Sequence, residues 1–358
     1  MTATDDQPDD TATGWEAINA AVAILYGDQE PKHYGTLLRW SLGGPDPLDG
    51  ISAWKRLEPV PHWHFVTYGL SELYAKESDN AEESGYGFEL TLRVACDPTD
   101  VDPPVWAFGL LQNLARYVFQ SGNVFRDGHW MPANGPLGVG QETQICSMAF
   151  LFDPELPAID TPNGHLAFIQ VVGITVGEEL AAKRWQTRRL LEALLPAMPL
   201  WVTDLARGAL LDHPDIREQI EVGTGRDGSS TSFVHTDVLG WAQQKRLLRP
   251  AITEIALGAR QVAELLALLP FRLPFGRSFT VIGRGAVLVF QPGDVNAMTQ
   301  TDGELRLTLT AEVARALMQT LQPRAGSYDM PGFETVRWKV EKTLIRDAEG
   351  KNVVATIG

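Results

Sequence analysis

Cysteine is scarce in this chain, and long apolar runs are missing from it. The 358 residues include two cysteines, Cys96 and Cys146, and each stands alone in a strand-like apolar stretch. Two isolated thiols in a chain of this length indicate core residues rather than a disulfide framework, which favours a reducing compartment. No apolar run in the sequence approaches the roughly 18 residues that a membrane-spanning helix needs. We therefore expect neither disulfides nor a membrane span.

Basic residues are outnumbered by acidic ones. The chain has 30 Lys and Arg against 45 Asp and Glu, which gives a formal net charge of -15. This charge repels phosphate backbones and anionic lipid headgroups, so the sequence predicts no nucleic acid partner and no membrane partner. The opening residues, Met-Thr-Ala-Thr-Asp-Asp-Gln, lack the basic start and the apolar core of a signal peptide. The expected location is cytoplasmic.

Common catalytic signatures are also missing. The sequence has no phosphate-binding loop ending in Gly-Lys-Ser/Thr, no Gly-x-Ser-x-Gly and no His-Glu-x-x-His. Gly223, Gly225 and Gly228 have the spacing of a dinucleotide-binding loop, but neither the preceding strand nor the following helix that this motif requires is evident. We assign no catalytic residue and no cofactor, and we predict that the protein is not an enzyme.

One pair of histidines leaves an enzymatic alternative open. His62 and His64 stand two residues apart at the start of a predicted strand, so both side chains face one side of the sheet. A zinc centre needs three or four ligands, and His129 or Asp127 could complete one only if the fold brings them close. The alternative is a metal-dependent hydrolase that uses the His62/His64 face. The interpretation we prefer is that each imidazole donates to a backbone carbonyl, and we assign no metal.

The sequence is rich in core-forming residues. Hydrophobic residues make up 44% of the chain and charged residues 21%, as in folded globular proteins. The length exceeds the size at which a single core keeps growing, which predicts two domains. We place a disordered acidic tail at 1–13, a first domain at 14–222, a linker rich in glycine and small polar residues at 223–233, and a smaller C-terminal α+β domain at 234–358.

Hydrophobic periodicity predicts helices and strands in mixed order. Helices are expected at 14–26, 105–120, 178–195, 259–269 and 311–321. Strands are expected at 33–41, 51–57, 87–95, 145–152, 165–175, 201–204, 252–257, 304–310 and 335–345, with a hairpin at 278–291. In the strand at 87–95, Glu89, Thr91 and Arg93 alternate with apolar residues, which predicts one wet face. Without a regular strand and helix rhythm, the class is α+β: two mixed α/β domains, each a sheet flanked by helices, joined by a short linker.

Several ordered motifs carry a family resemblance. They are GGPDPLD at 43–49, HWH at 62–64, YGLSELY at 68–74, GYGFELT at 85–91, LARYVFQS at 114–121, FIQVVG at 168–173 and WVTD at 201–204. In this order and spacing, the chain resembles the Suppressor of fused family. RSFT at 277–280 and LTLTAE at 307–312 continue the resemblance in the second half. The long charged insertion of animal members has no counterpart here, so the chain is similar to the shorter bacterial kind.

The resemblance implies a binding protein. In this family, two mixed α/β domains close around an extended peptide, which adds as a strand in the interdomain cleft. A strand edge supports such binding because its N–H and C=O groups are available to an incoming backbone. By resemblance, the peptide-binding wall in the first domain consists of Tyr117, Phe125, Asp127, His129 and Trp130. Tyr117 has an alternative interpretation as a core residue on its helix stripe.

The function that the resemblance implies is that of a negative regulator that sequesters a protein or peptide partner without catalysis. Among bacterial relatives, the concrete form is an immunity protein that neutralises a toxin domain. A strongly acidic binder suits a basic toxin domain through electrostatic steering. A structural subunit of a larger assembly is a further alternative. The motifs do not identify the partner.

Overall fold

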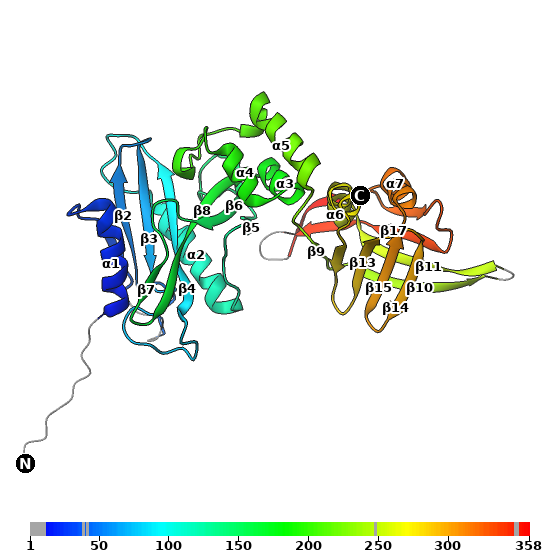
Figure 1. Ribbon diagram of the computed structural model, residues 1–358, viewed down its shortest axis with the longest axis horizontal. Coiled ribbons are helices and arrows are strands. Elements are labelled where there is room, and N and C mark those ends of the chain that lie inside the picture. Colours follow the sequence, from blue (N-terminus) through cyan, green and yellow to red (C-terminus); the bar gives the residue numbers. More distant parts are fainter. Residues whose placement is uncertain (1–11, 38–39, 41–42, 247–248, 347–350) are drawn as a thin grey trace, which may run out of the picture. The chain divides into compact units, whose positions relative to one another are not determined.

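Two compact units make up the chain. The computed structural model describes residues 12–37, 40, 43–246, 249–346 and 351–358 (Figure 1). Unit 1 comprises residues 1–182 and 187–217, and unit 2 comprises residues 183–186 and 218–358. Most of the expected acidic tail lies outside the described residues, as does part of the strand expected at 33–41. Each unit contains sheet and helix, which confirms the predicted mixed α/β class.

An eight-stranded mixed sheet forms the centre of unit 1. Its order is β1-β2-β3-β4-β8-β6-β5, and β7 also pairs with β8. β4 and β8 run parallel, whereas the other paired strands run antiparallel. The strands are β1 (Lys32–Gly35), β2 (Gly50–Arg56), β3 (His62–Tyr68), β4 (Glu83–Ala95), β5 (Trp130–Pro132), β6 (Ile145–Phe152), β7 (Ile159–Thr161) and β8 (Gly164–Thr175). β1 and β5 are therefore the two edges of this sheet.

Helices cover both faces of the unit 1 sheet. The apolar stripe of α1 (Thr13–Tyr26) packs against the face that carries Val66 of β3. The stripe of α2 (Val105–Ser121) packs against the face that carries Phe65, the preceding residue. Because neighbouring strand residues point to opposite faces, the two helices lie on opposite sides of the sheet (Figure 1). Among the helices that the structure describes, none has the length and apolar character needed to cross a bilayer.

The helix predicted at 178–195 is two helices, α3 (Val176–Arg184) and α4 (Thr187–Leu194). Trp185 stands between them and belongs to unit 2. Its indole Nε1 donates to Asp227 Oδ2 at 2.9 Å, and its ring lies so close to Gly223 that a Cβ there would be 2.2 Å away. Periodicity did not reveal the break, because buried apolar residues occur on both sides of it.

The linker expected at 223–233 is not loose throughout. Its first five residues are the end of helix α5 (Pro214–Asp227). Beyond the helix, Ser229 is fully buried: its N–H donates to the Phe271 carbonyl at 2.7 Å, and its hydroxyl donates to the Lys183 carbonyl at 2.5 Å. The prediction of an irregular linker is therefore wrong for this stretch, because tertiary contacts override the preference of glycine and serine for loops. The domain limits drawn from it stay a prediction.

Unit 2 combines two main sheets with one apolar core. The sheet orders are β14-β15-β13-β12-β9 and β10-β11-β17-β16, and β18 pairs with β19. Both α6 and α7 pack on the core that contains Phe279 and Trp338. The elements are β9 (Phe233–His235), β10 (Leu239–Arg246), β11 (Arg249–Gly258), α6 (Ala259–Leu268), β12 (Phe279–Ile282), β13 (Val287–Pro292), β14 (Ala297–Thr301), β15 (Glu304–Leu309), α7 (Ala311–Thr320), β16 (Gly326–Asp329), β17 (Val336–Glu341), β18 (Thr343–Arg346) and β19 (Val353–Ile357). The predicted hairpin is confirmed, since β12 and β13 pair antiparallel.

Candidate functional site

The residues of the predicted wall come together at one edge of the unit 1 sheet. Tyr117 lies on α2, Trp130 is the first residue of edge strand β5, and the other three lie in the segment that leads into β5. Within this segment, the His129 N–H donates to the Arg126 carbonyl at 3.1 Å, and Gly128 takes a φ of 85°. A positive φ at the third residue of a turn is typical of type II and favours glycine. This turn sets the direction in which β5 begins.

Strand β5 pairs with β6 on one side, and on its other side the described residues supply no strand. On the β6 side, the His129 carbonyl accepts from the Phe150 N–H and the Ala133 N–H donates to the Cys146 carbonyl, both at 2.9 Å. Because backbone groups alternate in direction along an antiparallel strand, those of Trp130 and Pro132 face the opposite side. Pro132 has no N–H, and proline in sheets is typical of edge strands. An added strand would meet the protein along this edge.

Aromatic rings connect α2 to the β5 edge. Tyr117 is 39% exposed and stacks on Phe125 at 5.7 Å, and Phe125 in turn stacks on Phe150 of β6 at 4.2 Å. Phe125 is buried, so it supports the Tyr117 ring and presents little surface of its own. The Tyr117 hydroxyl accepts from Asn123 Nδ2 at 2.9 Å. The alternative interpretation of Tyr117 as a core residue is wrong, because the side chain is exposed.

Asp127 already has partners within unit 1. Its Oδ2 accepts from Arg188 Nη2 at 2.8 Å and Nε at 3.1 Å, and its Oδ1 accepts from the Phe152 N–H at 3.3 Å. Both members of the ion pair are partly exposed, so the pair contributes only about 0–1 kcal/mol of stability. It ties the turn before β5 to α4. The sequence reasoning missed Arg188, since 61 residues separate it from Asp127 and no local pattern signals the pairing.

His129 is exposed at the start of β5. Its Nδ1 accepts from the Arg126 N–H at 3.3 Å, so the neutral ring carries its proton on Nε2. Partial desolvation of the ring, together with the charge of Arg126, lowers the pKa of His129 below its usual value, and the charge of Asp127 opposes this shift. The ring is therefore neutral near pH 7 and can donate from Nε2 to a partner. Trp130, the next residue, is half-buried.

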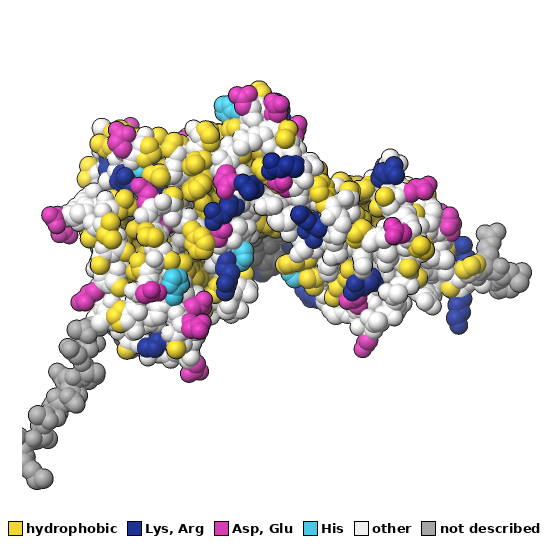
Figure 2. All heavy atoms as spheres, in the orientation of Figure 1, with side chains coloured by type: hydrophobic (Ala, Val, Ile, Leu, Met, Phe, Trp, Pro, Cys, Tyr) yellow, Lys and Arg dark blue, Asp and Glu magenta, His cyan; other side chains and the backbone are white. Residues whose placement is uncertain are grey.

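Acidic side chains are spread over the surface of both units. On the face that Figure 2 shows, they lie at many separate positions rather than in a single patch. Unit 1 has 12 Lys and Arg against 30 Asp and Glu, whereas unit 2 has 18 against 15, so the negative field of the chain originates in unit 1. Such a field raises the rate at which a basic partner is encountered, but it does not select one docking position.

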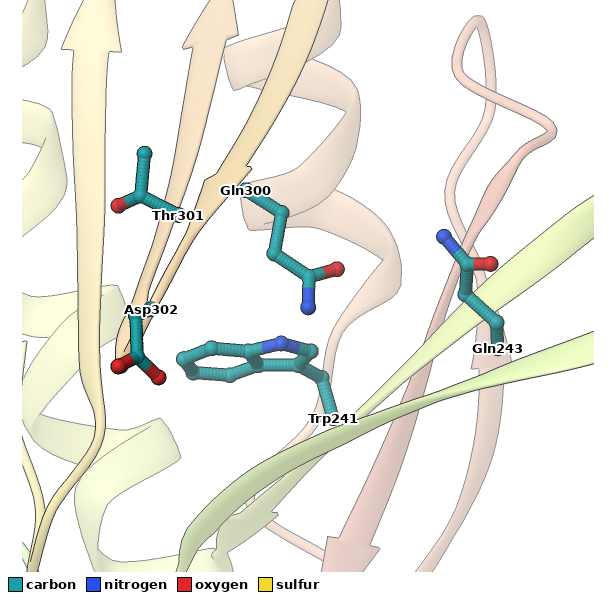
Figure 3. A pocket seen from close by; sticks show the side chains of 6 residues that line it. Trp241, Gln243, Gln300, Thr301 and Asp302 are labelled. Atoms are coloured by element: carbon teal, nitrogen blue, oxygen red, sulfur yellow. The ribbon is translucent and has the colours of Figure 1, made fainter.

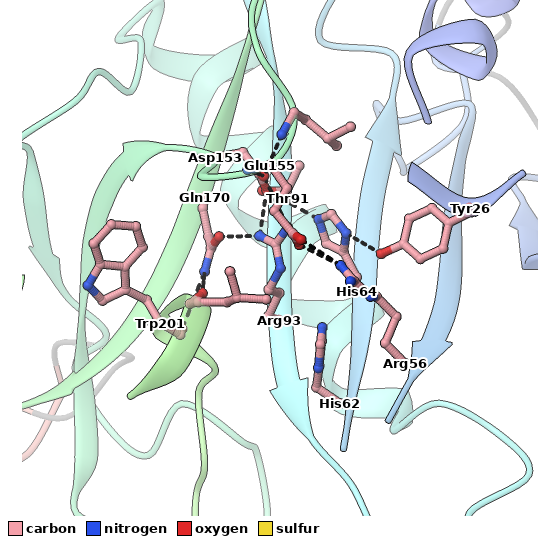
Figure 4. Close-up of polar contacts among 12 residues, drawn as sticks. Tyr26, Arg56, His62, His64, Thr91, Arg93, Asp153, Glu155, Gln170 and Trp201 are labelled. Carbon is pink, nitrogen blue, oxygen red and sulfur yellow. Dashed lines mark hydrogen bonds and ion pairs between the residues drawn. The ribbon is translucent and has the colours of Figure 1, made fainter. Parts of the chain in front are cut away.

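The polar face predicted to be wet on the strand at 87–95 is buried, so this prediction is wrong. Glu89, Thr91 and Arg93 of β4 are each 0% exposed. The Arg93 guanidinium donates to the two carboxylate oxygens of Asp153 at 2.6 and 3.0 Å, and it donates to Glu155 at 3.0 Å (Figure 4). A buried cation is tolerated here because carboxylates compensate its charge.

Further hydrogen bonds extend this buried network. Thr91 donates to Asp153 Oδ2 at 2.7 Å, and Gln170 of β8 accepts from Arg93 (Figure 4). The Gln170 amide then donates to the Leu200 carbonyl at 2.8 Å. The network therefore connects β4 and β8 to the loop after β6 and to the segment that contains the WVTD motif.

Both histidines of the candidate metal face are buried beside this network. His64 Nδ1 accepts from the Tyr26 hydroxyl at 2.6 Å, which leaves the ring proton on Nε2, 3.2 Å from Asp153 Oδ2. His62 Nδ1 donates to the Val60 carbonyl at 2.7 Å, as expected. The same expectation is wrong for His64, whose two ring nitrogens lie beside the Tyr26 hydroxyl and the Asp153 carboxylate. Within the described ranges, no group of three or more His, Cys, Asp or Glu side chains is arranged to hold a metal ion. This geometry gives His64 a structural role.

Burial and charge set the protonation states in the network. Burial lowers the pKa of His64 to about 4; the Arg93 charge acts in the same direction, and Asp153 opposes both. Burial also opposes the ionisation of Asp153, but hydrogen bonds and charge from His64 and Arg93 outweigh it and hold the pKa of Asp153 well below its usual value. At pH 7, His64 is therefore neutral and Asp153 is ionised.

A second buried carboxylate links two of the sequence motifs. Glu89 Oε1, from the GYGFELT motif, accepts from the N–H groups of Gly69, Leu70 and Ser71 at 2.9 to 3.1 Å. These three residues belong to the YGLSELY motif. Glu89 Oε2 accepts from the Thr67 hydroxyl at 2.6 Å. Burial raises the pKa of Glu89, and these hydrogen bonds oppose the shift. The two motifs thus specify one structural contact.

Comparison with known proteins places the chain in a family. Residues 44–208 match the family model described as Suppressor of fused protein (SUFU). The Suppressor of fused homologs of Homo sapiens and Mus musculus are each 35% identical over 238 residues, which is 62% of this chain and 49% of theirs. The chain therefore spans about half the length of these curated relatives.

Solved structures extend the comparison. A chain of the Sufu–Fu complex is 31% identical, with a TM-score of 0.55, over 58% of this chain and 97% of that one. Drosophila Suppressor of Fused has a TM-score of 0.77 at 22% identity, over 92% of this chain and 97% of that one, which shows a shared fold. The chain belongs to the Suppressor of fused family, as the motifs predicted.

Proposed function

We propose that this protein is a non-catalytic negative regulator that sequesters a protein partner by strand addition at the β5 edge. The supporting observation is the position of the five wall residues beside a sheet edge whose outer side has no strand among the described residues. The Sufu–Fu complex supports a protein partner, because a relative 31% identical to this chain is there in complex with another protein.

Side-chain anchors supply much of the affinity in this proposal. β5 has three residues, and Pro132 offers no N–H, so an added strand gains few backbone hydrogen bonds. The exposed Tyr117 ring provides an apolar contact, and His129 Nε2 provides a donor. Aromatic anchors of this kind carry about 1–3 kcal/mol each when they are buried by a partner.

Unit 2 has an edge strand of its own, β9, at the end of the five-stranded sheet. Phe233 on β9 is 48% exposed and contacts His235 edge-on at 5.4 Å between ring centroids. We extend the proposal to an interdomain clamp in which one extended segment of the partner pairs with both β5 and β9.

The partner class that suits this chain is a basic toxin domain, which the protein would neutralise as an immunity protein. The net charge of -15 supports this choice through electrostatic steering. Affinity capture from the native cell, followed by identification of the bound protein, tests it. An acidic captured partner whose affinity for the protein is the same at low and at high salt would contradict a role for electrostatic steering.

Hydrogen exchange with the captured partner tests strand addition. We expect partner binding to slow amide exchange in residues 126–134 and to leave β1, the opposite edge of the same sheet, unchanged. Tyr117→Ala should weaken binding by about 1–3 kcal/mol. The matched control is Tyr34→Ala, because Tyr34 on β1 is 46% exposed and also contacts α2, through Phe108 at 4.3 Å.

Two outcomes contradict the proposal. One is partner-induced protection that includes β1 but not residues 126–134. The other is a folded Tyr117→Ala variant that binds with wild-type affinity. Each variant is first compared with the wild type by melting temperature, because Tyr117 stacks on the buried Phe125.

A further inference from the structure

A groove of about 850 Å³ opens within unit 2, between two strands that each end a sheet. β10 is the last strand of the four-stranded sheet, and β14 is the last strand of the five-stranded sheet. The lining residues are Trp241 and Gln243 from β10, Gln300 and Thr301 from β14, and Asp302 and Gly303 from the turn to β15 (Figure 3). Side chains from two different sheets therefore line the groove.

Within the part of the chain that the structure describes, the polar side chains of the groove have no protein partner. Among the described residues, none forms a hydrogen bond or ion pair with the Trp241 indole N–H, the Gln243 and Gln300 amides or the Asp302 carboxylate. On the adjoining strand β15, by contrast, Arg306 pairs with Glu304 at 2.7 Å. The groove thus presents one aromatic ring, one carboxylate and two amides that are available to a ligand.

The backbone holds these groups in place. Thr301 and Glu304 are paired across β14 and β15, so Asp302 and Gly303 form a two-residue connection. Gly303 takes a φ of 74°, and Asp-Gly is a favoured sequence for such a connection. Trp241 packs against the core of unit 2. Because the ring and the turn are both fixed, a ligand that used them would lose little affinity to their ordering.

The chemistry of the groove favours a basic side chain. The face of an indole attracts cations more strongly than any other aromatic side chain does. Asp302 supplies the opposite charge, and the two amide oxygens can accept from a planar guanidinium. The basic residues of β10, Lys245 and Arg246, are not among the lining residues.

We propose that the groove is a second peptide-binding site, which takes an arginine side chain of an extended segment between Trp241 and Asp302. β10 and β14 each end a sheet, so a segment bound in the groove lies beside strands that have no further strand on their outer side among the described residues. The occupant is therefore a basic, extended stretch of a protein. This site lies within unit 2 and does not depend on the β5 proposal.

Titration of the full-length ¹⁵N-labelled protein with a short peptide tests this site. The probe is acetyl-Thr-Val-Arg-Val-Thr-amide, and the comparison peptide has citrulline, which is neutral and of similar shape, in place of arginine. Trp241→Phe identifies the Trp241 indole signal. We expect this signal to shift saturably at peptide concentrations up to about 10 mM, with about tenfold weaker binding of the citrulline peptide.

Charge variants complete the test. Asp302→Asn should weaken binding of the arginine peptide about fivefold, whereas Asp294→Asn, the same change at an exposed site between β13 and β14, should have no effect. The proposal fails if the indole signal does not shift, if citrulline binds as well as arginine, or if glucose or N-acetylglucosamine shifts the signal instead. The Trp130 indole reports on β5 in the same spectra, so failure at one site is distinguishable from failure at the other.

Discussion

The substitution Asp153→Asn tests how strongly the buried network stabilises unit 1. Asparagine keeps the shape of the side chain but replaces one carboxylate oxygen by an NH2 group, which cannot accept from Arg93. Both side chains of this ion pair are 0% exposed. Removing one partner of a buried pair costs about 3–5 kcal/mol, because the remaining charge is not returned to water. Glu155 stays as a second acceptor for Arg93, so we expect the lower end of this range, about 3 kcal/mol.

Native-state hydrogen exchange measures this effect in the intact chain. A chain with two compact units need not unfold in one transition, whereas exchange reports on each segment separately. The opening free energy of the β4 and β8 amides should fall by about 3 kcal/mol, and that of β13 in unit 2 should not change. The matched control is Asp160→Asn, because Asp160 is 93% exposed and pairs with the half-exposed His165 at 3.0 Å.

Two results would refute this reasoning. A loss below about 1 kcal/mol in β4, with an unchanged circular dichroism spectrum, would mean that the buried pair adds no net stability over a neutral one. A loss of the same size in Asp160→Asn would mean that the effect comes from net charge and not from burial.

Three further predictions follow from the same geometry. The folded pKa of His64, about 4, lies below its usual 6.5, so the unfolded state binds the proton more readily. The His64 contribution to the stability of unit 1 should be complete above pH 6.5, and the stability should fall by about 3 kcal/mol toward pH 4. Hydrogen exchange of the β3 amides in the wild type and in His64→Gln checks this. Gly128→Ala should lower stability by about 1–2 kcal/mol in thermal unfolding, because the residue has a φ of 85°, whereas Gly240→Ala, at a site with equally open surroundings and no positive φ, should not. Asp127→Arg places a second cation beside Arg188 and should weaken partner binding by about 1–3 kcal/mol in calorimetric titration. If the folded variant binds with wild-type affinity, the binding surface lies elsewhere.

Apolar periodicity predicted the elements that bury a face. The strand expected at 145–152 is β6, with the same limits, and the helix expected at 105–120 is α2, which ends one residue later, at Ser121. Core contact produces the spacing of apolar residues in both, so the sequence contains the signal. The prediction of a strand at 201–204 is wrong, because only an isolated bridge between Val94 and Thr203 forms there. Its apolar residues contact the core from an irregular segment, and the pattern cannot distinguish the two cases.

Exposed strands and distant contacts were beyond the reach of the sequence. Neither β10 nor β14 was predicted, since most of their residues are exposed and show no apolar alternation. The five wall residues came from the resemblance. Arg188, which holds Asp127, comes from another helix and has no local signal. The burial of Arg93 was hidden because the carboxylates that compensate it follow about 60 residues later.

Trp185 makes unit 2 discontinuous along the chain. A fragment that starts at residue 218 would contain Gly223 and Asp227 but not the indole that fills the space beside the glycine and donates to the carboxylate. Such a fragment would have a cavity at α5, with a cost comparable to loss of a buried tryptophan, about 3–5 kcal/mol. Genetic exchange of unit 2 between relatives by a single crossover is therefore disfavoured. A stable unit 2 should therefore include residues 183–186.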